Sequence, residues 1–249
     1  MDPTVRSALI GLNRTFYARF ALDFARTRSG WPAGFDLILP YLGRAANVLD
    51  LGCGNGRLLT FLAKHGWAGR YVGADSSREL LYVAEQTVRT LPPDGIGLDA
   101  RFEAIDFVDP DWTSRLGTST FDAIAALVVL HHIPGKEQRI EFLTACRALL
   151  RPRGVLVIST WQFLAAPRLR AHILPWATVG LADAGLEAGD YLLSWGEGAE
   201  GRRYCAAIDE DELEREASPA GLSVVETIRA DGREGNLILY AMMRQVSPI

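Results

Sequence analysis

Apolar positions along the chain follow two alternating patterns. Continuous apolar runs that stop at a polar or glycine-containing turn indicate buried strands, and these runs cover 47–51, 71–74, 101–104, 121–130 and 155–160. Between the runs, apolar residues recur at spacings of three or four, which predicts helices over 57–65, 78–88 and 138–150. Strands that alternate with helices predict a doubly wound α/β sheet whose core strands are parallel.

The two remaining stretches of the chain flank this repeating core. Residues 1–46 precede the first strand and contain a predicted helix with Leu9, Leu12, Phe16 and Phe20 at helical spacing. This helix is either a packing element with a solvated basic face or a lid over a ligand. A long connection, 161–221, separates the fifth strand from a closing hairpin at 223–229 and 237–243, and insertions of this length usually carry specificity. We expect one domain over residues 1–249, with 1–46 as a helical lid and 161–221 as a substrate-side insertion.

A glycine-rich turn with Gly52, Gly54 and Gly56 follows the first strand, where backbone amides and a helix N-terminus can meet a ligand. Arg57 breaks the third glycine of the dinucleotide pattern. Asp50, at the strand end, would repel the pyrophosphate of NAD by roughly 4 kcal/mol for a charge pair at 4 Å. It suits the ammonium and sulfonium of S-adenosylmethionine, so these residues favour S-adenosylmethionine as cofactor.

Acidic residues also end the second and third strands. Asp75 follows Gly56 by 19 positions, which predicts a carboxylate that binds the ribose hydroxyls; an ordinary helix-start acid is the alternative. Ser76 opens a capping sequence after it and joins the predicted cofactor-binding set. Asp106 is predicted to accept a hydrogen bond from the adenine amine, with Phe107 against the ring, or to be a plain loop acid.

Two adjacent histidines, His131 and His132, end the most apolar strand. The carboxyl ends of the strands form the ligand edge of an α/β sheet, so this pair is placed for chemistry. We expect one imidazole to pack and the other to face the cleft. Because no third ligand stands at a metal-site spacing, no metal is predicted.

The formal net charge of −4 does not suggest a stand-alone nucleic-acid binder, although it leaves room for a local basic patch. The three cysteines lack the spacing of a zinc site or a disulfide framework, which indicates a reducing compartment. The N-terminus lacks a signal-peptide pattern, and no apolar run is long enough to span a membrane. We therefore expect a cytoplasmic protein without a membrane partner.

Together these motifs resemble the class I S-adenosylmethionine-dependent methyltransferases. The resemblance covers roughly residues 45–160 and the closing hairpin, and it rests on Val48–Gly56, Asp75, Asp106 and Leu149–Gly154. Arg153 stands where the family usually has a second glycine. The resemblance implies a Rossmann-like, seven-stranded mixed sheet of order 3-2-1-4-5-7-6, with helices on both faces and the last-in-sequence strand antiparallel.

A narrower resemblance is to the methyltransferases that esterify 5-carboxymethyluridine at the tRNA wobble position. It rests on Phe24–Pro32, Leu130–Ile133, Gly189–Trp195 and Arg203–Tyr204. It implies Arg28, His131 and His132 as catalytic residues, and a substrate-binding set of Asp190, Trp195, Arg203 and Tyr204. Cys205 and Ala206 stand where that family typically has a second tyrosine and a histidine.

The sequence therefore predicts a methyltransferase whose acceptor is a carboxymethyl group on tRNA or a small molecule. A carboxylate acceptor is ionised at neutral pH and needs no general base, whereas an amine or phenol could use His131 or His132 as one. A third hypothesis is an S-adenosylmethionine-binding subunit without catalysis. Any need for an activator protein stays open.

Overall fold

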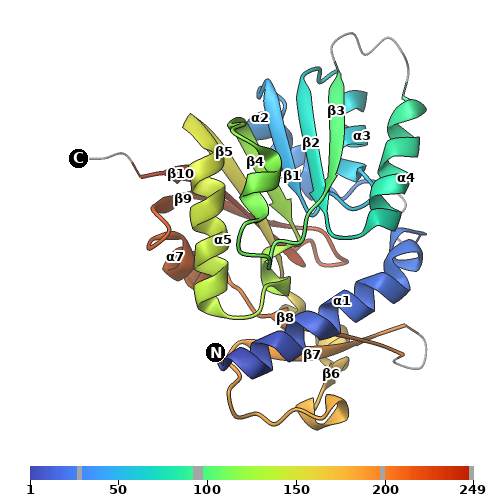
Figure 1. Ribbon diagram of the computed structural model, residues 1–249, viewed down its shortest axis with the longest axis vertical. Helices are drawn as coiled ribbons and strands as arrows, with labels where there is room; N and C mark the ends of the chain where they lie inside the picture. Colours follow the sequence, from blue (N-terminus) through green and yellow to red (C-terminus); the bar gives the residue numbers. More distant parts are fainter. Residues whose placement is uncertain (27–29, 92–97, 197–199, 247–249) are drawn as a thin grey trace.

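The computed structural model describes residues 1–26, 30–91, 98–196 and 200–246, and its centre is a seven-stranded sheet (Figure 1). The strand order is β3-β2-β1-β4-β5-β10-β9. β10 is antiparallel to both β5 and β9, and the other neighbouring pairs are parallel. This confirms the predicted order 3-2-1-4-5-7-6. The strands are β1 (Asn47–Leu51), β2 (Arg70–Asp75), β3 (Asp99–Ala104), β4 (Phe121–Leu127), β5 (Leu150–Trp161), β9 (Leu222–Ala230) and β10 (Ile238–Gln245).

Helices cover both faces of the sheet because its central strands are apolar on both sides. On β4, Ile124 and Ala126 pack in one core and Ala123 and Ala125 in the other. The first core is closed by α5 (Lys136–Leu149) and α7 (Glu210–Ala217). The second is closed by α2 (Gly34–Leu42) and α3 (Arg57–Lys64), with α4 (Arg78–Arg89) beside them.

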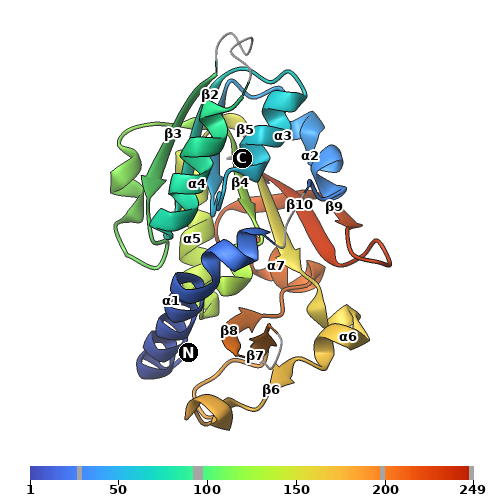
Figure 2. The ribbon, with the colours of Figure 1, turned by 90° about the vertical axis from the view of Figure 1, so that its right-hand side faces the viewer.

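The insertion between β5 and α7 builds a small sheet of its own beyond the end of the main sheet (Figure 2). Its order is β6-β7-β8, from β6 (Ile173–Leu174), β7 (Asp190–Trp195) and β8 (Gly201–Ala206), with α6 (Pro167–Arg170) before it. Within the long connection predicted for 161–221, residues 190–195 form a strand, because Leu192 and Leu193 are buried and pair with β6 and β8. The long helix α1 (Pro3–Arg26) lies beside β8.

β4 ends at Leu127, three residues earlier than predicted. Val128 has a φ of 62°, in the left-handed region that β-branched residues rarely adopt. Its amide donates to the carbonyl oxygen and to Oγ of Ser159, which hold this conformation. The chain then enters a short 3₁₀ turn, η2 (Leu130–His132), so the two histidines lie on a turn at the strand end.

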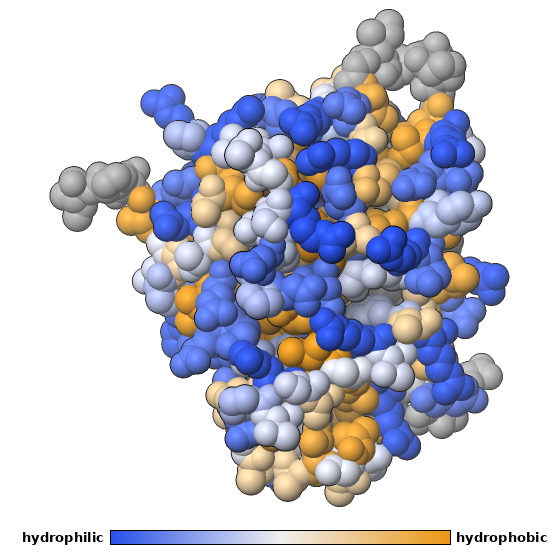
Figure 3. Space-filling model, viewed as in Figure 1, coloured by the Kyte–Doolittle hydropathy of each residue, from blue (hydrophilic) through white to orange (hydrophobic). Residues whose placement is uncertain are grey.

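The surface in the orientation of Figure 1 mixes hydrophilic and apolar residues over the main sheet, and apolar residues gather at the end where the insertion lies (Figure 3). Three further 3₁₀ segments complete the described elements, namely η1 (Trp112–Leu116), η3 (Phe163–Ala165) and η4 (Trp176–Val179). Among the described helices, none combines the length and apolarity that a membrane crossing needs.

Candidate active site

A cavity of about 870 Å³ opens at the carboxyl ends of the parallel strands, between the glycine-rich turn, α1 and the insertion. This is the edge at which open α/β sheets bind ligands. Its lining extends from the predicted cofactor residues to the histidine turn. The predicted site residues that line it are Asp50, Gly52, Gly54, Asp75, Ser76, Asp106, Phe107, His132 and Arg203.

The glycine-rich turn uses positive φ angles at Gly52, Gly54 and Gly56, which are 73°, 53° and 79°. A Cβ on Gly52 would lie 2.3 Å from Cγ2 of Val129, so the turn also needs the missing side chain at that position. Gly56 caps the N-terminus of α3 and does not line the cavity. Its role in the structure is therefore to start the helix.

Asp75 holds the turn and the next helix in place. Its Oδ2 accepts a hydrogen bond from the Gly54 amide at 2.9 Å, and its Oδ1 accepts one from the Ser77 amide at 2.9 Å. Burial raises the pKa of this carboxyl, and the backbone hydrogen bonds oppose that rise. A carboxylate offers about four lone-pair sites, so acceptor capacity remains toward the cavity for ribose hydroxyls.

Asp50 is 3% exposed at the end of β1 and accepts a hydrogen bond from the Tyr71 hydroxyl at 2.5 Å. Burial raises the pKa of Asp50 to about 7, and the hydrogen bond from Tyr71 opposes that rise. The charge of Asp75 adds to the increase. An ammonium group placed beside Asp50 would favour its ionised form, as the sequence argument for S-adenosylmethionine requires.

Asp106 lines the cavity, but its carboxylate is also tied to α1. Its Oδ2 accepts a hydrogen bond from Nε of Arg14 at 2.7 Å, and its Oδ1 accepts one from the Val108 amide at 3.2 Å. Phe107 packs edge-on against Trp112, with 5.5 Å between ring centroids. Asp106 and Phe107 therefore form a wall that joins the end of β3 to α1. Contact between these two residues and adenine stays a prediction.

His132 is the histidine that lines the cavity, whereas His131 is fully buried behind it with 4.3 Å between the ring centroids. Nδ1 of His132 lies 3.3 Å from the carbonyl oxygen of Tyr204, and Nε2 lies 2.8 Å from the hydroxyl of Tyr17. A carbonyl oxygen can only accept, so Nδ1 carries the proton and Nε2 accepts from Tyr17. This hydrogen-bond pattern leaves the basic nitrogen on the cavity side.

Asn13 on α1 joins the two segments that hold His132. Its Nδ2 donates to the carbonyl oxygen of His132 at 3.1 Å, and its Oδ1 accepts from the Tyr204 amide at 2.8 Å. Sequence reasoning missed both Asn13 and Tyr17. The available signal was that these two polar residues, spaced i and i+4, fall on the same side as the apolar stripe of the N-terminal helix.

The four residues predicted to bind substrate do not share one position. Arg203 lines the cavity, and its guanidinium carbon lies 4.8 Å from the ring centroid of Trp161. Tyr204 is fully buried and donates its hydroxyl proton to Oδ1 of Asp190 at 2.7 Å. Trp195 packs edge-on against Phe16 of α1, with centroids 5.7 Å apart. Arg28, the third predicted catalytic residue beside the two histidines, lies outside the described residues.

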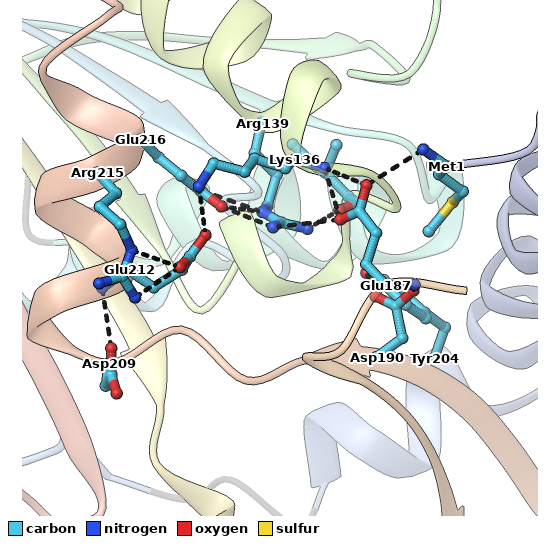
Figure 4. Close-up of polar contacts among 11 residues, drawn as sticks. Met1, Lys136, Arg139, Glu187, Asp190, Tyr204, Asp209, Glu212, Arg215 and Glu216 are labelled. Carbon is cyan, nitrogen blue, oxygen red and sulfur yellow. Dashed lines mark hydrogen bonds and ion pairs between the residues drawn. The ribbon is translucent and has the colours of Figure 1, made fainter. Parts of the chain in front are cut away.

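A buried polar network fastens the insertion to α5 and α7 (Figure 4). Arg139 of α5 donates to the carboxylate of Glu216 on α7 at 2.6, 2.8 and 3.1 Å. Glu187, just before β7, accepts from the Lys136 amide at 2.9 Å, and its carboxylate lies 3.4 Å from the amino group of Met1. The start of α1, the insertion and the main sheet thus meet at one set of charges, which fixes the wall that carries Arg203.

Comparison with protein families gives a match for residues 24–227, over which the chain fits the model of a family described as methyltransferase domain. Similar curated proteins include the ubiquinone biosynthesis O-methyltransferases of Actinobacillus pleuropneumoniae and Xylella fastidiosa. The first is 34% identical over 131 residues, covering 50% of this chain and 52% of the relative. The second is 33% identical over 162 residues, covering 58% and 60%. The chain thus spans about half the length of the curated relatives it matches.

Solved methyltransferase structures share the fold. Magnesium protoporphyrin IX methyltransferase from Synechocystis, with bound S-adenosylhomocysteine, matches with a TM-score of 0.63 at 19% identity, over 94% of this chain and 98% of its own. The 1,6-didemethyltoxoflavin-N1-methyltransferase of Burkholderia thailandensis matches with a TM-score of 0.64 at 19% identity, over 99% and 92%. The match extends through α1 and the insertion as well as the central sheet.

Proposed function

The chain belongs to the methyltransferase-domain family, and we propose that it transfers a methyl group to a hydroxyl on a small aromatic molecule. The observation that carries this proposal is the contact between Nε2 of His132 and the hydroxyl of Tyr17 at 2.8 Å, inside the cavity that also contains the glycine-rich turn. A phenol has to lose its proton as it is methylated, and this pair supplies a base at that place.

S-adenosylmethionine is the methyl donor, and it supplies an electrophilic methyl group on a sulfonium. The residues of the cavity fit its charged groups. Asp50 would pair with the ammonium group, Asp75 would accept hydrogen bonds from the ribose hydroxyls, and Asp106 with Phe107 would border the adenine. We propose that α1 acts as the lid over this end, because Arg14 connects it to Asp106.

In the proposed reaction, the acceptor oxygen attacks the methyl carbon in line with the carbon–sulfur bond. Tyr17 passes its hydroxyl proton to Nε2 of His132 as it takes the proton of the acceptor hydroxyl, so His132 is the final base and Tyr17 stays neutral. The carbonyl oxygen of Tyr204 holds the imidazole through its Nδ1 proton. Alignment of the two reactants and exclusion of water by α1 supply the rest of the catalysis.

The aromatic and cationic lining supports a small aromatic acceptor. Trp161 and Arg203 form one wall, with the guanidinium against the indole ring. The relatives from Actinobacillus and Xylella are named as O-methyltransferases, which favours oxygen as the methylated atom. The tRNA acceptor gains no such support. Two segments that suggested it have structural roles, since half of the β7 residues are buried and the Tyr204 ring is enclosed.

The test is methyl transfer from labelled S-adenosylmethionine in three parallel reactions. The acceptors are a small-metabolite extract of the host, a panel of catechols and phenols with and without a carboxylate, and total tRNA. We expect label in the extract and in members of the phenol panel. His132→Gln is expected to reduce this transfer without weakening cofactor binding, measured by calorimetry.

His65→Gln is the matched control, because the His65 imidazole, at the C-terminal cap of α3, does not line the cavity. Label confined to tRNA, released by mild alkali, would replace the proposal with a wobble-uridine ester. If His132→Gln transfers methyl groups to phenols at the wild-type rate, the proposed acceptor class stands and the proposed role of His132 as the base is refuted.

A further inference from the structure

Three potential metal ligands converge at the inner end of the cavity. His131 and His132 come from η2, and Cys205 comes from β8 in the insertion. One ligand atom from each lies within 4.8 Å of the other two. His131 and Cys205 are fully buried, while His132 borders the cavity. No metal was predicted from the sequence because the histidine pair has no third ligand near it in the chain. The third ligand, Cys205, lies 73 positions after His132.

One pair in this cluster already has the spacing of two ligands on one metal ion. Sγ of Cys205 lies 3.8 Å from Nδ1 of His132. Zinc–nitrogen and zinc–sulfur bonds of about 2.1 and 2.3 Å in a tetrahedron put such ligand atoms roughly 3.6 Å apart. The widest pair would have to close by about 1 Å, which is within the reach of a side-chain rotation.

The surroundings also supply the outer contact that a metal-bound imidazole requires. When Nδ1 binds a metal, Nε2 has to carry the ring proton, and that proton needs an acceptor. The Tyr17 hydroxyl, 2.8 Å from Nε2, can serve by rotating its own proton away. Two nitrogens and a thiolate are ligands that zinc prefers, and the cavity side leaves a fourth position for water.

We propose that His131, His132 and Cys205 bind a thiophilic divalent cation, with Zn²⁺ as the type, and that the bound ion inhibits methyl transfer. Binding releases the thiol proton of Cys205 to solvent and moves the single ring proton of His132 from Nδ1 to Nε2. The imidazole then presents an N–H to the cavity in place of a basic nitrogen. The binding half stands on the cluster alone, and the inhibitory half rests on the proposed function of His132 as base.

The binding half is tested by adding Co²⁺ to the full-length, metal-stripped protein and recording its absorption spectrum. We expect a thiolate-to-cobalt charge-transfer band and intense visible bands of a four-coordinate ion, both abolished by one equivalent of Zn²⁺. Cys205→Ser should lose the charge-transfer band, and Cys146→Ser, which changes another buried cysteine on α5, should keep it.

The double variant Cys53→Ser/Cys146→Ser leaves Cys205 as the one cysteine, so a band in it assigns the thiolate even if Cys205→Ser fails to fold. A wild-type spectrum without a thiolate band, or a band that the double variant loses, overturns the site.

The inhibitory half is tested with the phenol that the wild-type protein methylates. Stoichiometric Zn²⁺ should reduce the rate on the order of a hundredfold, the contribution expected of a general base, and a chelator should restore it. In Cys205→Ser, the rate with Zn²⁺ should equal that variant's own metal-free rate, which shows the loss of zinc sensitivity. Zinc-bound protein with an unchanged or higher rate overturns the inhibitory half while the spectrum upholds the site. Absence of methyl transfer to every acceptor counts against the proposed function, and the cobalt spectrum then decides the site alone.

Discussion

Replacing Arg139 with methionine should destabilise the protein more than a core substitution of similar size, because it leaves Glu216 buried without its partner. Glu216 has no exposed surface, and it accepts three hydrogen bonds from Arg139 in the native structure. Burial raises the pKa of the Glu216 carboxyl, and the Arg139 guanidinium opposes that rise. Removal of the Arg139 guanidinium must therefore raise the pKa of Glu216 further.

The magnitude follows from the fate of the remaining carboxylate. Breaking a buried ion pair by removing one partner lowers the free energy of unfolding by about 3–5 kcal/mol. Replacing both partners with apolar residues is often close to neutral, so Arg139→Met/Glu216→Leu should recover most of the loss. A carboxyl whose folded pKa is raised binds more protons when folded, so the stability loss in Arg139→Met should grow as pH rises from 5 to 8.

Urea unfolding of the wild type, the single variant and the double variant at pH 5 and pH 8 measures the free energy of unfolding of each. The differences give the loss in Arg139→Met, its recovery in the double variant and its dependence on pH. Arg215→Met is the matched control, since Arg215 pairs with Glu212 on the same helix at a surface position, where an ion pair contributes about 1 kcal/mol or less. The reasoning fails if Arg139→Met loses less than about 1 kcal/mol at pH 8, or if the double variant is no more stable than the single one.

The site makes three further predictions. Tyr17→Phe should lower kcat by about tenfold and His132→Gln by on the order of a hundredfold, both with little change in cofactor affinity by calorimetry. Asp75→Asn should weaken the binding of S-adenosylmethionine by about 2 kcal/mol, because hydrogen bonds to a charged acceptor are lost. An unchanged affinity would remove Asp75 from the site. Cofactor affinity should rise with pH through about 7, where Asp50 ionises, and Asp50→Asn should abolish that slope.

The central sheet was predictable because its signals are local. The run 47–51 contains its own strand, and the glycines after it dictate the turn, whose φ angles are positive at all three predicted positions. The closing hairpin was equally readable from its two apolar segments. The predicted end of a strand was wrong where tertiary contacts decide where the strand stops. Val128 leaves the sheet because Ser159 captures its amide, and no propensity of residues 128–130 encodes that.

The helix cap before α4 shows the same limit at a smaller scale. The sequence offers two adjacent serines, and the S-x-x-E pattern pointed to Ser76 as the cap. In the structure Ser77 caps the helix and Ser76 lines the cavity, because Asp75 takes the Ser77 amide and thereby sets where the helix begins. A strand-end acid that also organises the ligand turn therefore shifts the cap by one residue.

The acceptor side could not be derived because its parts come from segments far apart in the sequence. His132 is held by Tyr17 and Asn13 from the first helix and by the backbone of Tyr204 from the insertion, so its chemistry exists only when three segments meet. Each segment alone looks like ordinary packing. The same convergence brings Cys205 to the histidine turn, and a change of the His132 tautomer is enough to exchange a base for a metal ligand. The proposed acceptor chemistry and its proposed inhibition by a cation therefore depend on one junction, and a substitution at Asn13 should weaken both.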